Sequence, residues 1–264
     1  MNNANFFTIK VVEDKIYNEH ELIDFITNYS QGTLEIEIEE GPDLSVIKLF
    51  GKSLIESLHM LAENLGIDKK NIKLITFNLV QDLSVWPNME IQHPSECFTA
   101  ADRYEVPLDK QIQKHFGVFV GTSRWHRLYI ASMMHGLHKD KTMMSFWQHH
   151  LNNSMPANLW MDDVMRKDAN ESMRNYMFEF TKKLPMHLND EDIKINDNKG
   201  ADIRRGDWQT AYEILPYYNK IFVDVVCETW HEGTCFLPNE KTSRPLIAKT
   251  PFIVYAGKGF LANL

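Results

Sequence analysis

The chain has 264 residues, of which 44% are hydrophobic and 24% are charged, and its formal net charge at pH 7 is −8. This composition is typical of a globular protein, and the length suffices for one large domain or two small ones. The acidic balance argues against a protein dedicated to long stretches of DNA, whose phosphates require a basic surface.

The three cysteines, Cys97, Cys227 and Cys235, are odd in number and show no C-x-x-C spacing. Neither a disulfide framework nor a zinc knot is therefore expected, and a cytoplasmic setting is predicted. The sequence also has no signal-like N-terminus and no apolar stretch of about 18 residues, so we expect a soluble protein without a membrane partner.

The first 80 residues alternate between patterns typical of strands and of helices. Strands are predicted over residues 6–12, 33–39 and 72–80, and helices over 20–29 and 49–65. This alternation predicts an α/β domain with a mostly parallel sheet. Residues 81–107 lose the periodicity and are predicted to be one long loop, so the domains are placed at residues 1–112 and 113–264.

The second domain opens with a predicted strand over residues 116–120, which leads into Gly121-Thr122-Ser123-Arg124-Trp125-His126-Arg127 and a helix over 128–135. A glycine after a strand, hydroxyl residues and two arginines are typical of an anion-binding turn. The alternative is a capped helix with solvated arginines. A strand over 141–148, an irregular insertion over 149–207 with a helix at 171–183, and a short helix over 207–215 are predicted to follow.

Residues 221–264 contain a predicted buried strand that ends at Glu228-Thr229, a loop, a helix that begins at Asn239-Glu240-Lys241, and a second strand closed by Gly257. Ligands of parallel sheets bind beyond the carboxyl ends of the strands, where helix N-termini present free N–H groups. Lys241 would add a positive charge, and the glutamates could accept hydrogen bonds from sugar hydroxyls. The alternative is a solvent-facing Glu-Lys pair on a surface helix.

Eleven histidines raise the question of a metal site. The sequence has no H-E-x-x-H and no paired Cys and His motif, so no metal ligand is assigned, and Asp162-Asp163 fits a solvated turn as well as an acidic metal pair. The histidines considered are His135, His138, His149, His150 and His231. G-x-S-x-G, G-x-x-x-x-G-K-[ST] and G-x-G-x-x-G are also missing, which removes the commonest hydrolase, triphosphatase and dinucleotide-binding classes.

The segment from Glu228 to Gly257 resembles the donor-binding signature of the α-1,3-fucosyltransferases. Glu228 matches the first acid, Glu240-Lys241 match the Glu-Lys pair, and Thr250-Pro251-Phe252-Ile253-Val254 with Gly257 match the closing strand. Arg124-Trp125-His126-Arg127 is similar to the Arg-x-His-Arg turn of a glycosyltransferase-like group from bacteriophages and other viruses. Thr229 and Asn239 depart from the signature, which has Asn and Thr at these positions.

The resemblance implies two Rossmann-like domains that face a cleft, the GT-B arrangement, with the nucleotide-sugar donor in the C-terminal domain and the acceptor in the N-terminal domain. No cofactor and no essential metal are expected. In the donor-binding set, which also includes His126, Arg124, Arg127 and Lys241 would balance the diphosphate. Glu240 would hold the ribose, and Glu228 the sugar or the loop.

The resemblance also implies a base that deprotonates the acceptor hydroxyl, if the transfer is inverting. Asp82 is the first candidate, because it follows a predicted strand, and the other candidates are Glu96, His93 and Asp102.

The predicted function is therefore transfer of a sugar from a nucleotide sugar to a glycan or to a hydroxymethylated base of phage DNA, in the host cytoplasm if the protein is viral. The chain ends soon after Gly257, which predicts a reduced fold or a subunit completed by a partner, and a homo-oligomer stays open. The alternative function is a non-catalytic nucleotide-binding, glycan-binding or assembly protein on the same fold.

Overall fold

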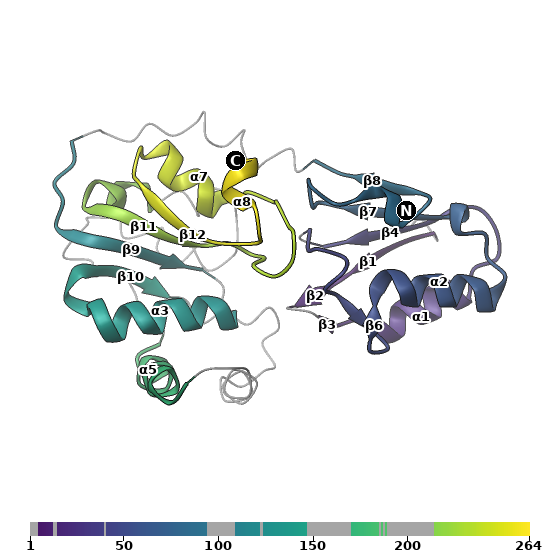
Figure 1. Cartoon of the computed structure of the whole chain (residues 1–264), viewed down its shortest axis with the longest axis horizontal. Helices are drawn as coiled ribbons and strands as arrows, with labels where there is room; N and C mark the ends of the chain where they lie inside the picture. The colour runs from purple at the N-terminus through teal and green to yellow at the C-terminus, as the bar shows by residue number, and fades with distance from the viewer. Residues whose placement is uncertain are drawn as a thin grey trace, which may run out of the picture. The chain divides into compact units, whose positions relative to one another are not determined.

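The computed structural model describes residues 5–12, 15–39, 41–93, 109–121, 124–146, 170–184, 186, 188 and 214–264 (Figure 1). The chain divides into two compact units. The first unit is Met1–Ser95, Thr229–Leu237 and Ala256–Leu264, and the second is Glu96–Glu228 and Pro238–Tyr255. Two segments after residue 113 thus belong to the first unit and not to the second as predicted, because Trp230 and Cys235 are buried in the hydrophobic core of the first unit.

A four-stranded parallel sheet forms the centre of the first unit, in the order β1 (Phe6–Ile9), β4 (Leu34–Ile38), β7 (Ile72–Thr76) and β8 (Met89–Ile91). The helices α1 (Glu19–Thr27) and α2 (Leu54–Leu65) lie on one face of this sheet (Figure 1). The alternating apolar residues of β4 are fully buried and pack in one core with the apolar faces of both helices. The predicted α/β fold with a parallel sheet is confirmed for this unit.

Several element boundaries of the first unit differ from the prediction. The strand predicted over residues 72–80 ends at Thr76, and α1 and β4 differ from the predicted ranges by one or two residues at each end. The strand predicted over residues 6–12 is divided into β1 and β2 (Val11–Val12), and the segment predicted as a loop contains the 3-10 turn η2 (Leu83–Val85) and β8. Strand β8 was not predicted. None of its side chains is fully buried, so its sequence lacks the apolar pattern of a core strand. Residues 48–53 form β5 (Lys48–Leu49) and β6 (Lys52–Ser53), which join β2 and β3 (Lys15–Ile16) in a small sheet.

The late start of α2 follows from a capping box at Ser53. The Glu56 backbone N–H donates to Ser53 Oγ at 3.3 Å, and the Ser53 backbone N–H donates to Glu56 Oε2 at 3.1 Å. These bonds satisfy two of the N–H groups that a helix start leaves unpaired, and they fix the first turn at Leu54. Gly66, in the left-handed conformation, ends the helix as predicted.

Ser53→Ala is therefore expected to destabilise the first unit by about 1 kcal/mol, the usual cost of losing a serine cap. Hydrogen exchange of the α2 amides measures this loss, with the exposed Ser45→Ala as the matched control. Equal exchange in both variants would contradict the role of the capping box.

The second unit is built on a parallel sheet in the order β10 (Thr142–Phe146), β9 (Lys114–Val120), β11 (Ile221–Cys227) and β12 (Phe252–Tyr255). Helices α3 (Trp125–His138) and α5 (Glu171–Thr181) share one hydrophobic core with Val118 and Val120 of β9. On the other face, η6 (Leu215–Asn219) and Ala248 pack on Phe119 and Ile221. The sheet has a core on each face, as in Rossmann-like folds.

The predicted strands and helices of the second unit are found with shifted ends. Helix α3 begins three residues earlier and ends three residues later than predicted, and α7 (Glu240–Ile247) begins where Asn239 caps it. Trp147 and most of the predicted insertion lie outside the described residues, as does all but the end of the helix predicted over 207–215; its last residue, Leu215, belongs to η6. The C-terminal helix α8 (Phe260–Asn263) was not predicted.

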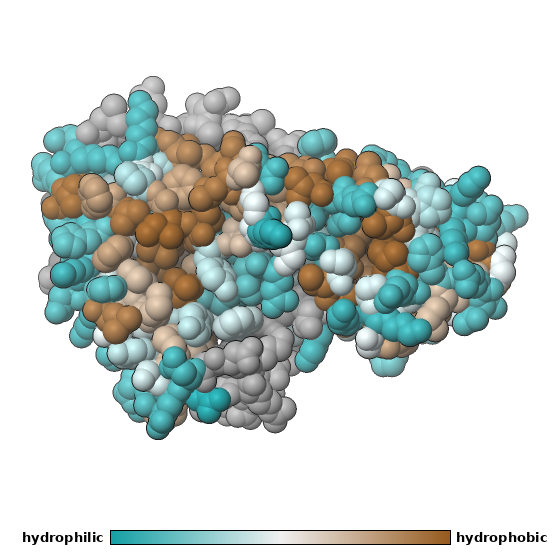
Figure 2. Space-filling model, viewed as in Figure 1, coloured by the Kyte–Doolittle hydropathy of each residue, from teal (hydrophilic) through white to brown (hydrophobic). Residues whose placement is uncertain are grey.

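Apolar side chains also reach the surface of the second unit. In the view of Figure 2, hydrophobic residues gather over the part of the sheet that holds β11 and β12. Exposed apolar residues of these strands are Phe222, Ile253 and Tyr255. Because β12 pairs only with β11 among the described strands, it is an edge strand there. No helix in the described part of the chain is long and apolar enough to cross a membrane.

The order of the strands singles out one place for a ligand. In the first unit, successive strands follow one another in one direction across the described sheet. In the second unit, the chain passes from β9 to β10 on one side and then to β11 on the other, so the direction reverses between β9 and β11. Ligands of open α/β sheets bind at such a reversal, beyond the carboxyl ends of the strands.

Candidate functional site

Three segments of the second unit meet the criteria for a site at this reversal. Helix α3 begins shortly after β9 ends, Glu228 directly follows β11, and α7 returns toward β12 from its start at Glu240. All the residues predicted to bind the donor lie on these segments: Arg124, His126, Arg127, Glu228, Glu240 and Lys241. Thr122 and Ser123 of the predicted turn lie outside the described residues.

The start of α3 is buried. Arg124 occupies the N-cap position, and Arg124, His126 and Arg127 are only 3%, 2% and 2% exposed. Arginines on a solvated helix surface would be largely exposed, so the alternative of a capped helix with solvated arginines is wrong. Burial of guanidinium groups requires compensating partners, which makes this helix start unlike an ordinary surface turn.

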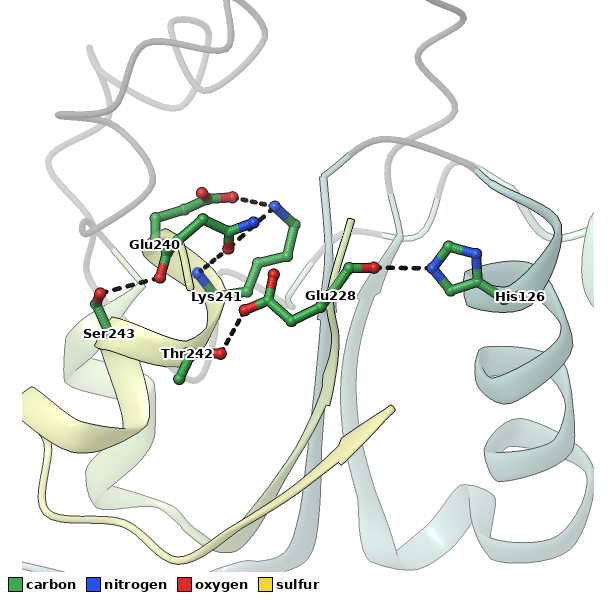
Figure 3. Close-up of polar contacts among 7 residues, drawn as sticks. His126, Glu228, Glu240, Lys241, Thr242 and Ser243 are labelled. Carbon is green, nitrogen blue, oxygen red and sulfur yellow. Dashed lines mark hydrogen bonds and ion pairs between the residues drawn. The ribbon is translucent and has the colours of Figure 1, made fainter. Parts of the chain in front are cut away.

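His126 ties α3 to the end of β11 (Figure 3). Its Nε2 lies 2.8 Å from the backbone oxygen of Glu228. Because a carbonyl only accepts, Nε2 carries the proton in this contact. The imidazole also stacks on Tyr255, with 5.9 Å between ring centroids. His126 thus fixes the backbone at Glu228 on the opposite side of the strand reversal.

Glu228 is a buried carboxylate with a defined partner. Its side chain is 1% exposed, and the hydroxyl of Thr242 in α7 donates to Oε1 (Figure 3). Burial raises the pKa of Glu228, while the positive charge of Lys241 and the bond from Thr242 act in the opposite direction. The sequence pattern did not indicate Thr242, although it lies next to the predicted Glu-Lys pair.

Glu240 and Lys241 form an ion pair at the start of α7, with side chains that are only 17% and 14% exposed. The Lys241 backbone N–H donates to the Asn239 side chain at 2.9 Å, which caps the helix. Burial lowers the pKa of Lys241 against the attraction of Glu240, and nearby Arg127 lowers it further. Burial alone would raise the pKa of Glu240, but Lys241 and Arg244 hold it below its usual value. The alternative of a solvent-facing pair is therefore wrong.

Tyr218 of η6 and Asp224 of β11 form a second buried polar pair in the same unit. The Tyr218 hydroxyl donates to Asp224 Oδ2 at 2.6 Å, and both residues are almost fully buried. Burial raises the pKa of Asp224 to about 6, although Arg244 and the Tyr218 hydroxyl favour its ionised form. The sequence feature that could have predicted this buried pair is the single Asp in the middle of the apolar strand IFVDVVC. It was not recognised from the sequence.

Among the described residues of β11 and of the starts of α3 and α7, together with Arg244, the charges have a small positive excess. Arg124, Arg127, Lys241 and Arg244 provide four cations, against the three carboxylates Asp224, Glu228 and Glu240. Arg127 and Lys241 are close enough for the first to depress the pKa of the second. Two neighbouring cations, one buried and one partly buried, beside two helix N-termini are suited to an anion with several oxygen atoms, such as a diphosphate.

Thr242→Val is expected to destabilise the second unit by roughly 1–3 kcal/mol, because the isosteric change removes the hydroxyl that donates to buried Glu228. Thr242→Ser retains the donor and is the matched control. Hydrogen exchange of the β11 and α7 amides reports the difference. Equal protection of the valine and serine variants would show that this bond contributes nothing.

The predicted acceptor-side residues belong to the first unit or lie outside the described residues. Asp82 is exposed and caps η2, where its Oδ1 accepts from the Ser84 backbone N–H at 2.9 Å. Hydrogen bonds from Ser84 lower the pKa of Asp82, which makes it a weak base. His93 is exposed, and Glu96 and Asp102 lie outside the described residues. The role of Asp82 as catalytic base stays a prediction.

Among the described residues, no group of three or more His, Cys, Asp or Glu side chains could hold a metal ion. The ring of His135 packs on that of Phe180, and the ring of His138 packs on that of Phe116. Nε2 of His231 lies 3.7 Å from Oε1 of Glu232. His149, His150, Asp162 and Asp163 lie outside the described residues.

Comparisons with known proteins gave no relative: no protein-family model matches the chain, and searches of curated proteins and of solved structures returned no match.

Proposed function

We propose that the protein is a glycosyltransferase that takes its sugar from a nucleotide-sugar donor, with the GT-B arrangement of two Rossmann-like domains. The observation that carries the proposal is the pair of cations formed by buried Arg127 and partly buried Lys241, beside Glu228 at the strand reversal of the second unit. A doubly wound sheet with this charge at its carboxyl edge suits a nucleoside diphosphate group. The resemblance of residues 228–257 to a donor-binding signature agrees with this location.

Each residue of the site has a distinct chemical task in the proposed reaction. Arg127 and Lys241 stabilise the negative charge that develops on the diphosphate as it leaves, and Arg124 adds positive charge at the start of α3. Glu240 orients Lys241 through one carboxylate oxygen and offers the other to a ribose hydroxyl. Glu228, held by His126 and Thr242, faces the donor sugar.

The transfer breaks the bond between the anomeric carbon and the diphosphate oxygen and forms a bond from that carbon to the acceptor oxygen. The hydroxyl proton passes to a base, for which Asp82 remains the first candidate, and the nucleoside diphosphate leaves with the electron pair. No step in this scheme needs a metal or another cofactor. The acceptor classes are a glycan and a hydroxymethylated DNA base, and the acidic net charge favours the glycan.

Isothermal titration with nucleoside diphosphates and the corresponding nucleosides tests the donor site. We expect at least one diphosphate to bind and its nucleoside to bind far more weakly, because most of the recognition is assigned to the diphosphate. No binding of any diphosphate would overturn the proposal.

Turnover separates the enzyme from the alternative of a non-catalytic binding protein on the same fold. Release of nucleoside diphosphate from a panel of nucleotide sugars, with glycan and hydroxymethylated DNA acceptors, is expected for the enzyme. Tight binding of a diphosphate with no release from any donor would favour the binding protein. Mass spectrometry of the DNA nucleosides distinguishes the two acceptor classes.

A further inference from the structure

The connection between β11 and α7 is not an open loop. Its residues Thr229–Leu237 pack within the first unit, where Trp230 and Cys235 join the hydrophobic core. We propose that Asn78, at the carboxyl end of β7, is a positioning residue for the anion site, because it holds this connection in place. The inference rests on the proposed function, since the anion site whose order it concerns is the proposed donor site of the second unit.

Asn78 uses both ends of its side-chain amide to hold the connection. Its Nδ2 donates to the backbone oxygen of Thr234 at 3.0 Å, and its Oδ1 accepts from the backbone N–H of Phe236 at 3.0 Å. The backbone N–H of Leu79 donates to the Phe236 oxygen at 3.0 Å. Asn78 is fully buried, so these bonds are made away from water, and losing one leaves a buried polar group unsatisfied.

Further contacts hold the same connection. Asp43 Oδ2 accepts from the Thr234 backbone N–H at 2.8 Å, and the Lys258 backbone N–H donates to the Gly233 oxygen at 2.9 Å. Gly257 packs so closely on Cys235 that an added Cβ would lie 2.4 Å from its sulfur. The segments that hold the connection come from distant parts of the sequence, which indicates a built feature of the fold.

Covalent continuity carries this restraint to the anion site. Glu228 immediately precedes the connection, and Asn239, which caps α7 at Lys241, follows it after Pro238. A free connection of this length would sample many conformations and would transmit that freedom to both ends. A connection that is already ordered reduces the ordering cost of ligand binding, so anchoring by Asn78 raises the affinity for the anion.

Asn78→Asp tests the inference, because it keeps the side-chain shape and the acceptor for Phe236 but replaces the donor to Thr234 with a carboxylate oxygen. We expect the affinity for the nucleoside diphosphate that binds the unaltered chain to fall about tenfold, as loss of pre-organisation predicts. Hydrogen exchange of residues 229–241 should accelerate, while that of β1 and β4 stays unchanged.

Leu58→Ala is the control, because it destabilises the first unit through its hydrophobic core and removes none of the hydrogen bonds that hold the connection. It should leave the affinity unchanged. If Asn78→Asp does not fold, Asp43→Ala removes the acceptor for Thr234 and is expected to lower the affinity in the same direction. If the affinity is unaltered in Asn78→Asp and Asp43→Ala, or if Leu58→Ala loses as much affinity as they do, the inference about Asn78 is overturned and the proposed function is not. Failure of the unaltered chain to bind any diphosphate instead overturns the proposed function.

Discussion

Lys241→Gln is expected to weaken nucleoside diphosphate binding by about 10-fold to 100-fold, the range that corresponds to loss of one charge-assisted hydrogen bond. The reason is that Lys241 is a partly buried cation beside Arg127 at the end of the strands, and glutamine keeps most of its length without the charge. Isothermal titration measures the loss. Lys139→Gln is the matched control, since this exposed lysine of the same unit follows the C-terminal end of α3.

The same substitution should change the dependence of binding on pH. Burial lowers the pKa of Lys241 in the unliganded protein below its usual value, and a bound anion favours the protonated form. Affinity should therefore be constant below that lowered pKa and fall as the pH rises through it. The ligand's own titration is shared by both proteins, so this additional fall should vanish in Lys241→Gln. Parallel pH profiles would contradict the role of the lysine.

Asp224→Asn is expected to remove a pH-dependent part of the stability of the second unit. Burial raises the pKa of Asp224 from 3.8 to about 6, so the folded state binds its proton more tightly than the unfolded state. Stability from this group is fully present below pH 3.8 and is lost as the pH rises to about 6. The loss amounts to about 3 kcal/mol, because one pKa unit corresponds to about 1.4 kcal/mol.

The measurement is hydrogen exchange of the β11 amides at pH 4 and at pH 7, corrected for intrinsic exchange rates. Between these values, Asp224→Asn should gain roughly 2 kcal/mol relative to the unaltered chain, because part of the loss has already occurred at pH 4. This gain is independent of the constant offset from its altered bonds to Tyr218 and Arg244. Tyr218→Phe is a useful companion, because it removes the hydroxyl that favours the ionised carboxylate and should raise the pKa of Asp224 further. If the stability of Asp224→Asn relative to the unaltered chain is the same at pH 4 and at pH 7, Asp224 is not a buried group that titrates in this range.

The sequence predicts the parts of this fold that local pattern controls. Alternating apolar residues located β4, the apolar runs located β9 and β11, and Gly66 located the end of α2. Strands β8, β3, β5 and β6 were missed, because short or half-exposed segments have too little hydrophobic pattern to be recognised as strands.

For the site, too, the sequence pattern predicts some features, whereas others depend on contacts between residues far apart in the sequence. The order of strand, acid and helix start placed Glu228 and Lys241 on neighbouring segments, but spacing alone left burial undecided for them and for the arginines of α3. The folded chain decides it, since tertiary packing leaves the arginines and Glu228 buried and Lys241 partly buried. The bonds of Asn78 to Thr234 and Phe236 span more than 150 residues of sequence, so no local pattern could reveal them.

Ligand-induced protection from hydrogen exchange, mapped with the nucleoside diphosphate that binds most tightly, tests the location of the donor site most directly. We predict new protection at the start of α3 around Arg127, at Glu228, and at the start of α7 around Lys241. The first-unit helices α1 and α2 should show no change. Protection confined to segments other than the ends of β9 and β11, or none at a saturating ligand concentration, would contradict a donor site at the strand reversal.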